Sequence, residues 1–261
     1  MSNVKKYYNE KAHSYDDYSS QLFFRVYDAV TWKITEPYIP KDSEALVLDA
    51  AGGTGKWSIP IAKCGPKVVL VDVSDGMLNV ARRKIAKEGL QDRIEVRKGD
   101  VRKLDFEDET FDLVFCDHAL CFIKEQESVV RELVRVLKRG RRLIISCQNR
   151  YVLSLSLVSE NIDYASKILL NESPFVMRNA LNVYTLSPDE LKHMLERYGV
   201  KVEKMVGKVC TMPLAISWEK LSSEKHSEDL VKKVLEIEFE LVSRADTVSL
   251  GSHIQAIGYK Q

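Results

Sequence analysis

The sequence predicts an α/β protein built on a doubly wound, mostly parallel sheet. Between residues 45 and 150, short apolar runs rich in Val, Ile and Leu alternate with segments of helical periodicity. Three of these runs end on an aspartate, and a glycine-rich turn follows the first run. Because ligands bind beyond the carboxyl ends of strands in open parallel sheets, these features predict a binding site along that edge.

The apolar runs predict the strands. The first five are Ala45–Asp49, Lys67–Asp72, Arg93–Lys98, Asp112–Asp117 and Arg142–Gln148. Two later runs, Val200–Gly207 and His253–Lys260, predict two further strands.

Helices are predicted between the strands by periodicity and by their end residues. Ser74 is a suitable N-cap for a helix that Gly89 ends. A second helix is predicted over Lys124–Lys138, with Gly140 after its end. Pro60 predicts an irregular start or a kink in the helix that follows the first strand.

The pattern changes after residue 150. Apolar residues at helical spacing predict an inserted helical segment over Tyr151–Leu170. Ser187–Gly199 begins with a capping-box pattern, and Glu228–Arg244 is amphipathic, so both are predicted helices. Without repeats or linkers we expect one domain over 1–261, with its sheet core at about 44–150, 184–210 and 251–261. The helical lid segments are expected at about 1–43, 150–183 and 211–247.

Composition and charge make several classes of protein unexpected. The 261 residues hold 39 Lys and Arg against 38 Asp and Glu, so the formal charge of +1 disfavours a nucleic acid as partner. Neither a secretory leader nor a membrane-spanning run is predicted. The five cysteines are odd in number and lack CxxC spacing, which favours reduced thiols, no metal site and a cytoplasmic location.

The turn after the first strand, Ala50 to Gly55, predicts a ligand held against bare backbone. A phosphate-binding P-loop does not fit, because Ala50 stands five residues before Gly55 and Trp57 follows Lys56. A dinucleotide fingerprint is weakened by Ser58 at its third glycine position. A nucleoside without a pyrophosphate is the remaining interpretation.

Val47 to Gly55 resembles the first motif of class I S-adenosylmethionine-dependent methyltransferases, with Ala51 in place of the first glycine. Further matches follow in the family's order, and the resemblance is closest to the small-molecule methyltransferases grouped with the ubiquinone and menaquinone C-methyltransferases. These matches are Val68–Asp72 with Met77–Leu78, Gly99–Val101, Leu104–Asp112 and Glu132–Lys138.

The resemblance implies a seven-stranded Rossmann-like sheet with an antiparallel last strand, and S-adenosylmethionine as cofactor. It also implies which residues bind the cofactor: Tyr8, Asp49, Ala51, Gly52, Gly53, Thr54, Gly55, Asp72, Val73, Met77, Asp100, Val101 and Asp117. In the family the acid at the position of Asp72 binds the ribose hydroxyls, and the acid at the position of Asp100 accepts from the adenine amino group. Asp49 is expected either to meet the ligand's ammonium group or to hold the amides of the turn.

His118 and Tyr15 are the candidate catalytic residues. His118 follows the fourth strand on the substrate face, where an imidazole could take a proton, although a lone histidine is more often structural. Tyr15 belongs to a cluster of four tyrosines near the N-terminus, and the family folds a similar Tyr-rich helix over the cofactor. The cluster could also be a docking face for the helix.

The sequence therefore predicts methyl transfer to a small, partly apolar acceptor. Apolar residues after the fifth strand are expected to line the acceptor pocket as a lid, the alternative being that these helices only thicken the core: Leu153, Leu157, Ile168, Leu169, Phe175 and Met177. Alternatives are a nucleic-acid methyltransferase, a nicotinamide-dependent oxidoreductase and a cofactor-binding module without catalysis. We expect no nucleic-acid partner and no insertion into a membrane.

Overall fold

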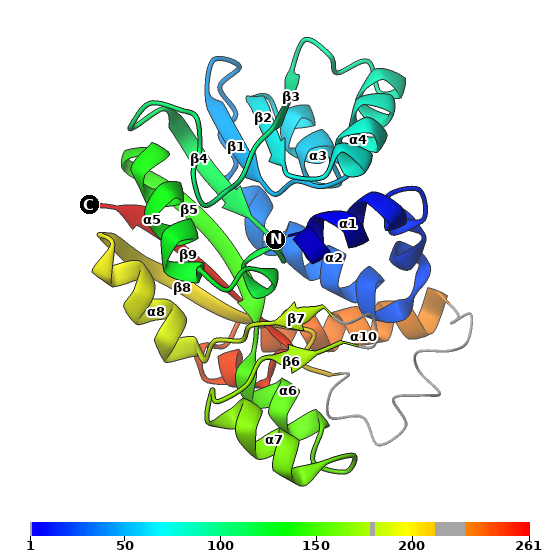
Figure 1. Cartoon of the computed structure of the whole chain (residues 1–261). Helices are drawn as coiled ribbons and strands as arrows, with labels where there is room; N and C mark the ends of the chain where they lie inside the picture. Colours follow the sequence, from blue (N-terminus) through cyan, green and yellow to red (C-terminus); the bar gives the residue numbers. More distant parts are fainter. Residues whose placement is uncertain (1, 178–180, 212–227) are drawn as a thin grey trace.

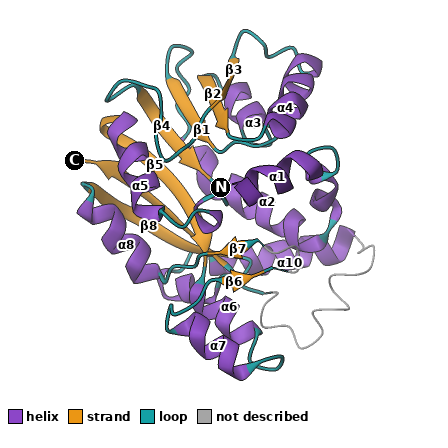
Figure 2. Cartoon of the chain, viewed as in Figure 1, coloured by secondary structure: helices purple, strands orange, loops and turns teal. Residues whose placement is uncertain are grey.

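The computed structural model describes residues 2–177, 181–211 and 228–261. Its centre is a seven-stranded sheet in the order β3-β2-β1-β4-β5-β9-β8, with helices on both faces (Figures 1 and 2). The five strands β1 to β5 run parallel to one another, whereas β9 runs antiparallel to both β5 and β8. The strands are β1 (Leu46–Ala50), β2 (Lys67–Asp72), β3 (Ile94–Lys98), β4 (Phe111–Cys116), β5 (Leu137–Gln148), β8 (Val200–Lys208) and β9 (His253–Lys260). The predicted sheet and its antiparallel last strand are confirmed.

Strand β5 begins earlier than the sequence indicated. Its pairing with β4 passes from Leu137 directly to Arg142, so the residues between them bulge out of the register. Gly140 supplies the left-handed backbone of this bulge, with φ of 71°. Helix α5 (Gln126–Val136) consequently ends two residues before the predicted end at Lys138.

The crossover helices follow their cap residues. Ser74 accepts a hydrogen bond from the backbone N–H of Met77 and starts α4 (Asp75–Lys87). Ser187 and Glu190 form both hydrogen bonds of the capping box at the start of α8 (Pro188–Arg197). Helix α3 is short (Ser58–Lys63) and begins only after a series of turns, which is the irregular start that Pro60 predicted.

The N-terminal helices lie beside the carboxyl edge of the sheet (Figure 1). They are α1 (Ser2–Lys11), the 3₁₀ helix η1 (Tyr15–Ser20) and α2 (Leu22–Thr35), followed by the short 3₁₀ helix η2 (Glu36–Tyr38). Helix α1 packs against α4, and α2 packs against α10 (Glu228–Leu241). The carboxyl end of β4 is followed by the 3₁₀ helix η3 (Leu120–Phe122), and η4 (Ala245–Leu250) precedes β9.

The insertion after β5 is two helices rather than one continuous helical segment. Helix α6 (Arg150–Ser156) ends before a turn, and Asn161 caps α7 (Ile162–Leu169) by accepting from the backbone N–H of Tyr164. A short hairpin of β6 (Phe175–Val176) and β7 (Asn182–Val183) follows, which the sequence did not indicate because each strand has only two residues. Part of the predicted lid at about 211–247 lies outside the described residues.

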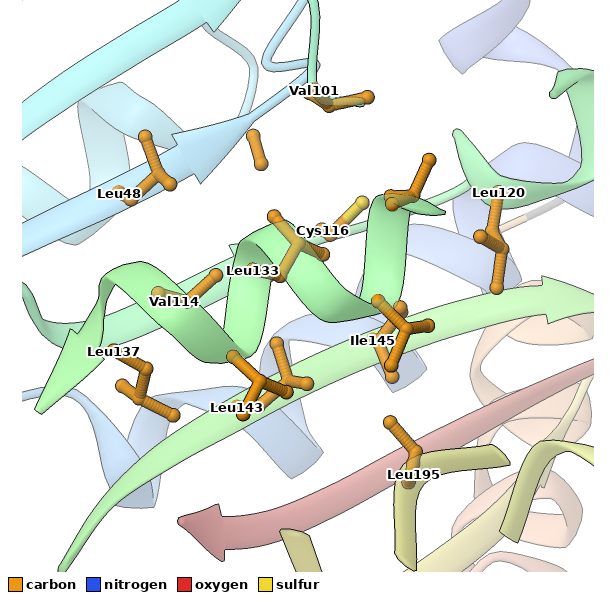
Figure 3. Packing of buried hydrophobic residues seen from close by; sticks show 14 of the residues in the cluster. Leu48, Val101, Val114, Cys116, Leu120, Leu133, Leu137, Leu143, Ile145 and Leu195 are labelled. Carbon is orange, nitrogen blue, oxygen red and sulfur yellow. The ribbon is translucent and has the colours of Figure 1, made fainter. Parts of the chain in front are cut away.

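The core lies on both faces of the sheet, because the central strands carry apolar residues at successive positions. On one face, Leu48 and Val114 pack with Leu133 of α5 and Leu195 of α8 (Figure 3). On the other face, Val47, Leu70 and Phe115 pack against α3 and α4. Burial on both faces holds the strand ends in place, and the polar residues beyond them form the site.

Candidate active site

Two cavities open along the carboxyl edge of the sheet. The first has a volume of about 650 Å³, and nine residues predicted to bind cofactor line it: Tyr8, Ala51, Gly53, Asp72, Val73, Met77, Asp100, Val101 and Asp117. The second, of about 530 Å³, adds Asp49, Gly52 and Thr54. Gly55 is in the lining of neither; it packs toward Leu70 and Ala81. The structure thus brings most of the predicted set together, and Gly55 is the exception.

The glycine-rich turn leaves backbone open to these cavities. Gly53 has φ of 55°, and a Cβ added there would meet no atom within 4 Å. A Cβ on Gly52 would lie 2.7 Å from the carboxylate of Asp49. Ala51 also adopts a left-handed φ of 60°, which is strained for alanine and explains why the resembling motif has glycine there.

Asp72 joins the turn to the start of α4. Its carboxylate accepts from the backbone N–H of Gly53 at 3.0 Å and from that of Ser74 at 2.8 Å. Burial raises the pKa of Asp72, and these backbone hydrogen bonds oppose the shift. The carboxylate therefore orders the local backbone and also lines the first cavity.

Asp49 lies beneath the turn and is 1% exposed. Its carboxylate accepts from the Ser58 hydroxyl at 2.5 Å. Burial raises the pKa of Asp49 to about 7, against the effect of Ser58. The carboxylate also accepts a hydrogen bond from the backbone N–H of Ser58. Both expected roles of Asp49, contact with an ammonium group and support of the turn's amides, stay predictions.

Asp100 lines the first cavity but is paired with a residue that the sequence did not single out. Arg102 donates to Oδ1 at 3.1 Å and to Oδ2 at 2.8 Å, and also reaches Glu125. Although burial raises the pKa of Asp100, Arg102 lowers it below the ordinary value. A hydrogen bond from adenine would therefore have to go to a carboxylate oxygen of Asp100 that already accepts one from Arg102.

Asp117 is the centre of a buried network. Its Oδ1 accepts from Lys208 at 2.8 Å and from Ser146 at 2.6 Å, and from the hydroxyl of Tyr27 at 2.9 Å. The indole N–H of Trp57 donates to Oδ2 at 3.1 Å. Burial by itself would raise the pKa of Asp117, but the charge of Lys208 and these donors hold it well below the usual range.

His118 follows Asp117 in a left-handed conformation with φ of 56°. Its backbone N–H donates to the Ser146 hydroxyl at 2.9 Å, which fixes this unusual backbone. The imidazole packs against the rings of Tyr27, Phe122 and His253, the last with centroids 4.7 Å apart. Burial lowers the pKa of His118 to about 4, so the ring is neutral at pH 7.

A third cavity, of about 740 Å³, lies under the N-terminal helices. Six aromatic side chains line it: Tyr7, Tyr8, Tyr15, Tyr18, Phe24 and Phe122. Burial raises the pKa values of Tyr8 and Tyr15 well above the ordinary value, so both phenols stay protonated. Tyr15 and His118 line all three cavities and mark the place where they meet.

Comparison with known proteins agrees with this geometry. A family model described as a methyltransferase domain matches residues 47–140. The chain is 37% identical over 115 residues to a demethylmenaquinone methyltransferase of Lactiplantibacillus plantarum, covering 43% of this chain and 48% of that enzyme. It is 29% identical to the ubiquinone/menaquinone biosynthesis C-methyltransferase UbiE of Idiomarina loihiensis, covering 64% and 71%. Residues 47–140 therefore match a methyltransferase domain, and both of these relatives are methyltransferases.

The methyltransferase fold extends beyond the matched segment. A solved Thermotoga maritima structure, described as a possible histamine N-methyltransferase, superposes with a TM-score of 0.62 at 19% identity, covering 97% of this chain and 98% of that one. This likeness shows a shared fold. In sequence, the chain spans about half the length of the Lactiplantibacillus relative.

The first cavity fits the cofactor of class I S-adenosylmethionine-dependent methyltransferases. Asp72 presents a half-buried carboxylate that lacks a cationic partner among the described residues, so ligand hydroxyls can donate to it. The open side of Gly53 leaves room for a ligand against the backbone, and Met77 and Val101 supply apolar walls. These residues suit a nucleoside with a polar ribose and an apolar base.

The predicted lid is partly wrong. Leu157 and Ile168 form a small separate cluster, packed by Leu153 and Phe175, because α6 and α7 bury their apolar faces against each other. Leu169 is 45% exposed. Of the six apolar residues predicted to line the acceptor pocket, Met177 lines the third cavity.

Sequence reasoning missed the polar partners Lys208, Arg102 and Ser146. Lys208 comes from β8, about ninety positions after Asp117, and no local pattern connects the two. Ser146 did carry a signal, because it is a polar residue inside the apolar run of β5.

Two further properties bear on the methyltransferase domain. In residues 2–177, 181–211 and 228–261, no helix is long and apolar enough to span a membrane. Within the same ranges, no cluster of three or more His, Cys, Asp or Glu side chains is arranged to hold a metal ion.

Proposed function

We propose that this chain transfers a methyl group from S-adenosylmethionine to a small, partly apolar molecule. The observation that carries the proposal is the meeting of the three cavities at Tyr15 and His118. The first two cavities suit the nucleoside and amino-acid parts of the cofactor, and the aromatic third cavity suits the acceptor. Methyl transfer requires both molecules in line at one point, which this junction supplies.

The cofactor is held by residues of the strand edge. Asp72 would accept hydrogen bonds from the ribose hydroxyls, and Met77 and Val101 would pack against the base. Tyr8, on α1, also lines this cavity. Asp49, in the second cavity, would become ionised beside an ammonium group, because a nearby cation lowers the pKa that burial has raised.

His118 acts as the proton acceptor and Tyr15 as a positioning group. When bound, S-adenosylmethionine supplies an electrophilic methyl group on a positively charged sulfur, and that charge is lost on transfer. A ring nitrogen of neutral His118 can take the proton that an acceptor hydroxyl or amine releases. Tyr15 stays protonated and can donate a hydrogen bond to an oxygen of the acceptor.

The third cavity favours a planar acceptor. Its two charged side chains have partners elsewhere, since Lys56 lies 2.6 Å from Asp28, and Asp16 lies 2.7 Å from Lys84. Aromatic walls with neutral phenol donors suit an apolar ring bearing oxygen substituents. The Lactiplantibacillus relative is named for a demethylmenaquinone, and a ring of that kind is the acceptor that we propose. Nucleic acid does not suit this apolar, aromatic cavity, and the five free cysteines suit a cytoplasmic location.

Ligand binding and turnover test the proposal. S-adenosylhomocysteine should raise the melting temperature, since ligand at about a hundred times its dissociation constant adds roughly 2.7 kcal/mol, whereas NAD should not. Purified protein with labelled S-adenosylmethionine should methylate a hydroxylated naphthalene but not RNA or DNA. Stabilisation by NAD alone would instead indicate an oxidoreductase.

A further inference from the structure

Lys208 is a lysine at the end of an edge strand whose side chain points inward and is 0% exposed. Its Nζ lies 2.8 Å from Asp117 Oδ1, 2.8 Å from the Tyr27 hydroxyl and 3.0 Å from the Thr31 hydroxyl. Three acceptors for three N–H donors match an ammonium group with its hydrogen bonds complete.

Stability alone gives little reason for this ion pair. Removing two charges from water costs several kcal/mol per ion, and a well-packed apolar pair is often as stable. Asp117, however, lines both the first and the second cavity. A role for Lys208 in the function of the site therefore explains its burial better than a role in stability.

Two carboxylates at the junction of the cavities are paired with lysines. Asp117 is paired with Lys208, and Asp28, which lines the second cavity, is paired with Lys56 at 2.6 Å. Asp49 faces the same cavity without a cationic partner among the described residues. A lysine thus cancels the charge of Asp117 and of Asp28, whereas Asp49 and Asp72 line the cavities without such a partner among the described residues.

We propose that Lys208 neutralises Asp117 so that the reaction centre does not hold the positively charged cofactor more tightly than its neutral product. This inference rests on the proposed function. An unpaired carboxylate would stabilise the sulfonium, whose charge is lost during transfer, and would thereby raise the barrier. With Lys208 in place, Asp117 keeps its hydrogen bonds without contributing a net charge.

The same network has a positioning effect that must be separated from this electrostatic one. Ser146 donates to Asp117 and accepts the backbone N–H of His118, so loosening the network would also disturb His118. If the network becomes disordered, the affinities for charged and neutral ligands should fall by the same factor. A change of charge should change the ratio of their affinities.

Calorimetric titration at pH 8 with S-adenosylmethionine and S-adenosylhomocysteine tests the proposal. Lys208→Met should raise the ratio of affinity for the charged ligand to that for the neutral one, on the order of tenfold. Asp117→Asn should lower the same ratio by a similar factor. The double variant Lys208→Met/Asp117→Asn should return to within about threefold of the original ratio.

Tyr27→Phe is the matched control, because it removes a hydroxyl from the network without changing any charge. This variant should bind both ligands with affinities lowered by the same factor. Equal effects of Lys208→Met and Asp117→Asn on the two ligands would overturn the proposal, and Asp117→Asn tests it alone if Lys208→Met does not fold. Failure of the unaltered protein to bind either ligand would instead contradict the proposed function.

Discussion

The cofactor half of the site, meaning the first two cavities at the strand ends, differs in construction from the acceptor half, meaning the aromatic third cavity. The cofactor half uses residues at or just beyond the carboxyl ends of neighbouring strands, such as Gly53, Asp72 and Asp117. The acceptor half joins α1, η1 and α2 to η3 and the hairpin after α7. One half is thus determined by local motifs, whereas the other depends on long-range packing.

This difference predicts that substitutions in the two halves have separable effects. Changes in the cofactor half should alter the affinity for S-adenosylhomocysteine. Changes in the acceptor half should alter turnover and leave that affinity alone.

His118→Gln should have the largest effect. Losing a proton acceptor is expected to lower kcat by about a hundredfold to ten-thousandfold, with the affinity for S-adenosylhomocysteine changed less than about threefold. Single-turnover rates and calorimetry measure the two quantities. Unchanged turnover would remove His118 from the mechanism.

Asp72→Ala should show the reverse pattern. Loss of charge-assisted hydrogen bonds to two hydroxyls costs about 1.5 to 3 kcal/mol, or roughly tenfold to a hundredfold in affinity. Calorimetric titration with S-adenosylhomocysteine measures the loss, and thermal unfolding without ligand serves as the control for folding. An affinity equal to that of the unaltered protein would show that Asp72 orders the turn but does not bind the cofactor.

Two residues of the site, His118 and Asp49, should oppose each other in the pH dependence of stability. The pKa of His118 is lowered to about 4, so its contribution to stability is complete above about pH 6.5 and is lost as the pH falls toward 4. The pKa of Asp49 is raised to about 7, so its contribution is present below about pH 4 and is lost as the pH rises through 7.

Denaturant unfolding from pH 4 to 8 tests this opposition. Relative to the unaltered protein, His118→Gln should lose less stability on acidification, by at most about 3 kcal/mol. Asp49→Asn should lose less stability as the pH rises through 7. Two variants with the same pH profile as the unaltered chain would contradict the assigned directions.

Asn9→Ala tests a contact that joins the halves. The Asn9 side-chain oxygen accepts from the Ser74 hydroxyl at 2.7 Å and from the backbone N–H of Gly76 at 2.9 Å, which holds α1 on the start of α4. Loss of this contact should lower the free energy of unfolding by about 1 kcal/mol. It should also lower the affinity for S-adenosylhomocysteine several-fold. Asn79→Ala, on the exposed part of α4, is the control and should leave the affinity unchanged.

Leu169→Ser should have the smallest effect. Because this side chain is 45% exposed, stability should change by less than about 0.5 kcal/mol. Since Leu169 is not in the lining of the third cavity, turnover should also persist. A large loss of turnover, measured under saturating cofactor, would indicate that α7 does form part of a lid over the acceptor.

The contrast between the halves also explains how much could be predicted. The strand-end residues were found because each follows an apolar run directly, and parallel strands bring such ends to one edge. The lid was partly misassigned because an apolar stripe shows only that a helix face is buried, not against what. Leu157 and Ile168 are buried, but within the α6–α7 pair.

The sequence by itself determined the doubly wound sheet, the glycine turn and the acids at the strand ends, because these depend on periodicity and local backbone sterics. Tertiary structure alone decided that Lys208 pairs with Asp117 and that Tyr15 and His118 line the same cavities. Those contacts join elements whose separation along the chain leaves no periodic signal. The geometry and charge of a pair are set by the packing that brings its members together.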